Sequence, residues 1–93
     1  MNKPVSNKNN DRFIRLGIAI ATLRKIRGLS QEKLAEKANI SRNLLSKIEA
    51  PNMPHGFSLE VLFDLADALD VDPADLIGAS VFPDKIINKT KKQ

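Results

Sequence analysis

The chain contains no cysteine and no tyrosine, and only one of its 93 residues is a histidine. Without cysteine there is neither a disulfide framework nor a thiolate for catalysis or metal binding. No apolar run is long enough for a signal peptide or a membrane span, which predicts a soluble, cytoplasmic protein without a membrane partner. No nucleophile-base motif and no glycine-rich phosphate loop is present, so the sequence does not indicate an enzyme.

Basic residues are also missing from one long stretch of the chain. Residues 51–80 hold six acids and no Lys or Arg, whereas residues 1–27 have a net charge of +6. Residues 28–50 add +1 and residues 81–93 add +3, which gives the total of +4. Such an uneven distribution of charge along a chain often reflects only solvated surfaces, but it also orients a protein as it approaches a polyanion. With 42% hydrophobic residues, the chain suffices for one small domain.

Hydrophobic spacing predicts a first helix that begins at Asp11 and is closed by Gly28. Residues 1–10 before it are rich in Asn and Lys and are expected to be a disordered basic leader. Gly17 lies inside this helix, where glycine is unfavourable, so we expect another helix to approach closely there. The apolar side of the helix is formed by Phe13, Leu16, Ile20 and Leu23.

The most informative segment is residues 30–50, which predicts two short helices joined by a three-residue turn. Ser30 and Ser41 each stand where an N-cap is expected. Leu34, Ala35 and Ala38 form a narrow apolar stripe on the first of these helices, and Leu45 and Ile48 form one on the second.

The other side of that second helix carries Arg42, Asn43, Ser46 and Lys47, with no acid among them. Such side chains suit contacts with base edges and phosphates. Leu44 beside them either touches a thymine methyl or packs on the preceding helix, and packing is favoured.

Two more helices are predicted after a loop with two prolines and a glycine. Ser58 caps the fourth, and Asp72 followed by Pro73 starts the fifth. With no convincing strand, the chain is predicted to be all-α, with a domain over residues 11–80 and a basic tail with an apolar start over residues 81–93. His55 is expected to be a surface-loop histidine, and the acids fit helix caps and a solvated face, so neither a metal nor a cofactor is predicted.

These residues resemble the XRE-like helix-turn-helix family, the Cro and phage-repressor type of DNA-binding protein. The resemblance covers about Phe13 to Ile77, and the matching positions fall into two segments. The first is formed by Leu23, Arg24, Gly28, Leu29, Ser30, Gln31, Leu34, Ala35, Ile40, Ser41, Leu45, Ile48 and Glu49, and the second by Ser58, Leu59, Glu60, Leu62, Leu65, Ala66, Ala68, Leu69, Val71, Leu76 and Ile77. The resemblance implies a five-helix lambda-repressor-like domain whose second and third helices form the helix-turn-helix.

The resemblance also implies roles for individual residues. Arg42, Asn43 and Lys47 would read bases: Arg42 suits guanine, Asn43 suits adenine, and Lys47 reaches guanine or a phosphate. Gln31 would grip a phosphate and brace Arg42, and Ser41 and Ser46 would be phosphate contacts. Arg24 and Glu49 match a pair that forms a salt bridge and aims the recognition helix.

The implied function is that of a sequence-specific transcriptional regulator, a repressor that binds a palindromic operator in double-stranded DNA as a homodimer. No small-molecule effector is implied. The fifth helix and Val81-Phe82 are the candidates for the dimer contact. The alternative is a protein-interaction module of the antitoxin or bridging-factor type. The loop after Glu49 departs from the family pattern because it is longer, lacks an early glycine and contains no Lys or Arg.

Overall fold

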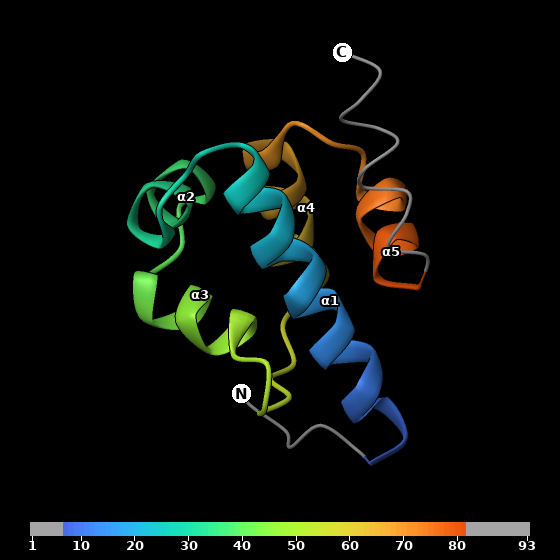
Figure 1. The fold of residues 1–93 in the computed structure, drawn as a ribbon. Helices are drawn as coiled ribbons and strands as arrows, with labels where there is room; N and C mark the ends of the chain where they lie inside the picture. Colours follow the sequence, from blue (N-terminus) through green and yellow to red (C-terminus); the bar gives the residue numbers. More distant parts are fainter. Residues whose placement is uncertain (1–6, 82–93) are drawn as a thin grey trace.

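The computed structural model describes residues 7–81, and this part of the chain forms five helices and no strand (Figure 1). The helices are α1 (Asn7–Ile26), α2 (Gln31–Ala38), α3 (Arg42–Glu49), α4 (Leu59–Leu69) and α5 (Pro73–Val81). The predicted all-α class and the three-residue turn between the second and third helices are therefore confirmed. None of the helices described here is long and apolar enough to cross a membrane.

Three serines fix the starts of α2, α3 and α4. The hydroxyls of Ser30, Ser41 and Ser58 each accept a hydrogen bond from the backbone N–H three residues further on, at 3.0, 3.0 and 3.1 Å. Each bond satisfies one of the N–H groups that the first turn of a helix leaves unpaired. The three predicted N-caps are confirmed.

Three helices end in the same left-handed turn. Gly28, Asn39 and Asp70 follow α1, α2 and α4 with φ values of 75°, 58° and 61°. In each case the N–H of the next residue donates to the carbonyl five positions back, at 3.0 Å. Glycine adopts this backbone without cost, and Asn and Asp tolerate it better than most residues do. The cap at Gly28 was expected, whereas the other two were not singled out from the sequence.

Helix α1 runs through the middle of the molecule and packs against α3, α4 and α5 (Figure 1). Helix α2 completes the body by packing against α3 and α4. Their apolar sides meet in one core, in which Ile20, Leu34, Leu45, Leu65, Leu69 and Leu76 are fully buried. The core positions two short helices, α2 and α3, at one side of α1.

Gly17 lies where α1 crosses α3. A Cβ placed on Gly17 would collide with the backbone carbonyl oxygen of Ile48. The close helix contact expected at this glycine is therefore confirmed, and its partner is the last turn of α3. The absence of a side chain at Gly17 lets α3 lie against α1 backbone to backbone.

The start of α1 differs from the expectation. The helix includes Asn7–Asn10, which were predicted to belong to a disordered leader. This first turn has no apolar residue, so the spacing of hydrophobic residues did not indicate that it is helical. Within the helix, Asn9 accepts a hydrogen bond from Arg12 at 3.0 Å. The remaining leader residues 1–6, and all of the tail except Val81, lie outside the described residues.

Candidate nucleic-acid interface

Helix α3 presents a polar face to solvent because its apolar residues are held in the core. Leu45 and Ile48 are buried, and Leu44 is half-buried against the same core, which favours packing over an exposed role. The exposed side chains are those of Arg42, Asn43, Ser46 and Lys47, with the exposed N-cap Ser41 at the leading end. We call these four α3 residues the polar face of α3.

The end of α3 is fixed by the ion pair that the family resemblance implied. Arg24 Nε lies 2.8 Å from Glu49 Oε2, and Arg24 Nη2 lies 3.0 Å from Glu49 Oε1. The two side chains are only 11% and 4% exposed, so the pair is buried. Arg24 Nη1 also donates to the carbonyl of Leu29 at 2.7 Å. A single guanidinium therefore joins α1, the α1–α2 turn and the C-terminal end of α3.

Gln31 makes a different contact from the one expected. Its Nε2 donates to Glu49 Oε1 at 2.9 Å. This bond leaves the amide oxygen of Gln31 free to accept from Arg42, so the implied brace on Arg42 stays a prediction. A buried carboxylate is a stronger acceptor than a neutral group, and Glu49 has lone pairs to spare after binding Arg24. In the described residues Gln31 thus ties the start of α2 to the end of α3, and Arg42 stays exposed.

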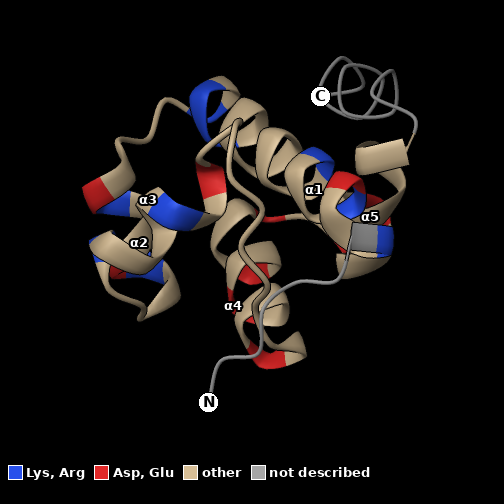
Figure 2. Ribbon diagram, turned by 90° about the horizontal axis from the view of Figure 1, so that it is seen from below, with Lys and Arg blue, Asp and Glu red and all other residues tan. Residues whose placement is uncertain are grey.

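Among residues 7–81, the acidic side chains lie elsewhere than on the polar face of α3. Glu49 is the only acid of α3, and it is buried and paired with Arg24. The acids of residues 51–80 lie on α4, on its turn into α5 and on α5 itself. Figure 2 shows acidic positions repeated along α4, away from α3. The polar face of α3 therefore offers cationic and amide groups without a carboxylate beside them on the same face.

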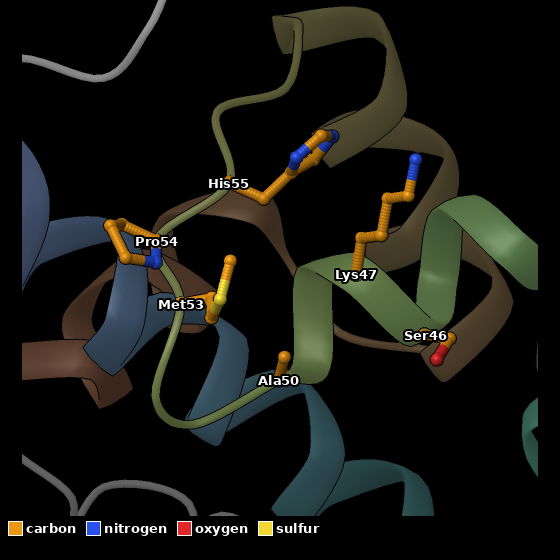
Figure 3. Close-up of a pocket in the computed structure, with 6 residues that line it drawn as sticks. All are labelled: Ser46, Lys47, Ala50, Met53, Pro54 and His55. Atoms are coloured by element: carbon orange, nitrogen blue, oxygen red, sulfur yellow. The ribbon is translucent and has the colours of Figure 1, made fainter.

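A hollow on this side of the molecule was not predicted from the sequence. A hollow of about 350 Å³ lies between the last turns of α3 and the α3–α4 loop (Figure 3). It is lined by Ser46, Lys47, Ala50, Met53, Pro54 and His55. The sequence indicated a long loop without Lys or Arg, but the way it folds back on α3 depends on contacts between distant residues.

Metal-binding groups do not gather in the described part of the chain: within residues 7–81 no three His, Cys, Asp or Glu side chains are close enough to hold an ion. His55 is half-buried in the loop and lines the hollow.

A short helix held in the core, a three-residue turn, and a second short helix with an exposed polar face define a helix-turn-helix domain. Comparison with known families agrees: the helix-turn-helix model matches residues 20–76. The chain belongs to this family, in its XRE-type branch. Its five helices have the lambda-repressor-like arrangement that is also found in solved structures of related regulators.

The relatives are phage and bacterial regulators. Over 63 residues the chain is 40% identical to the immunity repressor protein of Bacillus phage phi105; this match covers 68% of the chain and only 42% of the repressor. The crystal structure of the restriction-modification controller protein C.AhdI from Aeromonas hydrophila is 33% identical, with a TM-score of 0.64, and the match covers 69% of this chain and 94% of that one.

A third relative is SinR, the master regulator for biofilm formation, whose crystal structure is in complex with DNA. It is 35% identical with a TM-score of 0.61, and the match covers 67% of this chain and 97% of that one. The region shared with these solved structures is nearly the whole of each of them.

Proposed function

We propose that this protein is a sequence-specific DNA-binding transcriptional regulator whose helix α3 enters the major groove. The observation that carries the proposal is the polar face of α3, which is exposed, free of acids and fixed in direction. Two buried residues, Leu45 and Ile48, and the Arg24–Glu49 pair hold the helix from behind. A rigid helix with exposed donors at its leading end is what major-groove recognition requires.

The leading end of α3 supplies the groups for reading bases. Arg42 suits a bidentate contact with guanine O6 and N7, and Asn43 suits one with adenine N6 and N7. Lys47 lies about one turn further along the same face and reaches a base or a phosphate. Ser41, Ser46 and Gln31 are proposed phosphate contacts; Gln31 is half-buried and already bonded to Glu49, so Ser46 is the cleaner position to test.

The phage relative supports the direction of regulation. That protein is an immunity repressor, and the SinR structure shows a regulator of this fold on DNA. We therefore propose that the present chain also represses transcription.

We further propose that the protein acts as a homodimer on a palindromic site. Ile77 and Val81 lie four residues apart on α5, and both are exposed apolar side chains. A second copy of α5 would cover them and place two α3 helices on half-sites about 34 Å apart. Sedimentation at micromolar concentration, with and without DNA, tests this step: a strict monomer in both conditions would contradict it.

Selection of bound sequences from a random duplex pool tests the function itself. We expect one enriched motif, with affinity for it falling with salt at a log-log slope of about −0.9 for each phosphate contact. Arg42→Ala should relax the motif at one position of each half-site, whereas Ser46→Ala should weaken all duplexes evenly. A pool that stays random, with no measurable binding at low salt, would overturn the proposal and favour a protein-interaction module.

A further inference from the structure

The hollow beside α3 continues the polar face of α3 toward the C-terminal end of the helix. Asn43, Ser46, Lys47 and Ala50 stand at positions i, i+3, i+4 and i+7, so they form one stripe along the helix. The last three of them line the hollow, and the α3–α4 loop forms its other wall (Figure 3). A ligand that binds along the polar face of α3 would therefore also lie over this hollow.

The walls of the hollow differ in chemistry. Ala50, Met53 and Pro54 are apolar, and Met53 is 66% exposed. Lys47 and His55 supply the polar edge, and Figure 3 shows the His55 imidazole directed toward the side that Lys47 borders. The Lys47 ammonium group thus borders the same hollow as the apolar wall, at the His55 side and away from Met53 and Ala50 (Figure 3).

The loop that carries Met53 is held in place at its far end. Phe57 meets Phe13 of α1 edge to face, with ring centroids 5.6 Å apart. Pro51 and Pro54 restrict the backbone in between. Because both ends of the loop are fixed, the apolar wall has a defined position relative to Lys47.

A donor and an apolar wall that border one hollow match one base edge in the major groove. Thymine is the only base that presents a methyl group there, and its O4 acceptor lies next to that methyl group. Resting on the proposed DNA-binding function, we propose that the hollow is a thymine-reading subsite. The C5-methyl group packs against Met53 and Ala50, and Lys47 donates a hydrogen bond to O4. The loop thereby adds specificity at a position beyond those read by Arg42 and Asn43.

The test replaces thymine by deoxyuridine, which removes only the methyl group. The probe is the duplex enriched from the random pool, with each thymine substituted in turn. For the wild-type chain we expect one position in each half-site where the substitution weakens binding about fourfold, the loss for one buried methyl group. Met53→Ala should bind the thymine and deoxyuridine duplexes equally at that position.

Leu59→Ala is the matched control. Leu59 is an apolar residue of α4 that is also 66% exposed and does not line the hollow. This variant should keep the fourfold preference for thymine. Both substitutions remove exposed side chains, so folding should be preserved in each, and circular dichroism checks that it is.

Three results would overturn the subsite while leaving the proposed function intact. In the first, deoxyuridine has no effect at any position. In the second, the preference for thymine is the same in wild type and Met53→Ala. In the third, Met53→Ala weakens enriched and random duplexes equally, which would mean that the loop packs on the sugar-phosphate backbone. If no sequence is enriched at all, the proposed DNA-binding function is refuted, and the proposed subsite is refuted with it.

Discussion

Replacing Arg24 by alanine should destabilise the protein far more than an ordinary surface substitution. The variant leaves the Glu49 carboxylate buried, because Glu49 is only 4% exposed, with Gln31 Nε2 as its one remaining side-chain donor in the described residues. It also removes the donor to the Leu29 carbonyl. Breaking a buried pair by deleting one partner costs about 3–5 kcal/mol, since an unpaired charge remains inside the protein.

That cost is a large share of the stability of a small domain, which is about 5–15 kcal/mol. At about 4–8 °C per kcal/mol, a loss of 3 kcal/mol lowers the melting temperature by about 12–24 °C. Thermal denaturation followed by far-ultraviolet circular dichroism measures this directly. Urea denaturation at 25 °C gives the free energy of unfolding for comparison.

Arg15→Ala provides a matched control on the same helix. Arg15 also forms an ion pair, with Asp11 at 2.9 Å, but the two side chains are 57% and 72% exposed. Exposed pairs contribute about 0–1 kcal/mol, so this variant should melt within a few degrees of wild type. The contrast between the two arginines isolates the effect of burial, because both substitutions remove the same side chain.

A double variant separates the pair from the packing of Arg24. If the charge left on Glu49 causes the loss, Arg24→Ala with Glu49→Ala should be more stable than the sum of the single variants implies, by about 1–3 kcal/mol. A melting temperature of Arg24→Ala equal to that of Arg15→Ala would refute the reasoning, because it would mean that the Glu49 carboxylate becomes solvated without loss of stability.

Three smaller predictions concern single residues of the helices and their caps. Gly17→Ala should lower the free energy of unfolding by about 1–3 kcal/mol, because its Cβ meets the Ile48 carbonyl; an unchanged urea midpoint would show that α1 and α3 separate freely. Ser58→Ala should cost about 1 kcal/mol in the same assay through loss of the α4 cap. Ser46→Ala, which removes an exposed hydroxyl with no partner in the described residues, should leave the midpoint unchanged and would contradict this account if it did not.

The features predicted correctly from the sequence are those set by neighbouring residues. Ser30, Ser41 and Ser58 were found because an N-cap bonds to an N–H only three residues away. Gly17 stood out because glycine is costly inside a helix, and the reason proved to be the approach of α3. The exposed side of α3 followed from the spacing of Leu45 and Ile48, which are buried as expected.

The features that were missed depend on residues far apart in the chain or on polar segments. Gln31 and Glu49 are 18 positions apart, and only the folded molecule shows that the Gln31 amide donates to the buried carboxylate. The first turn of α1 has no apolar residue, so hydrophobic spacing placed the start of the helix four residues too late. The hollow depends on the path of a loop whose position is set by contact with α1.

Amide chemical-shift mapping tests most directly whether the polar face of α3 is the surface that meets DNA. The wild-type chain, labelled with nitrogen-15, is titrated with the duplex enriched from the random pool. The largest changes should fall on Arg42, Asn43 and Lys47, with smaller ones on the α3–α4 loop. Changes centred on the acidic residues of α4 and α5, with α3 unaffected, would contradict the central claim.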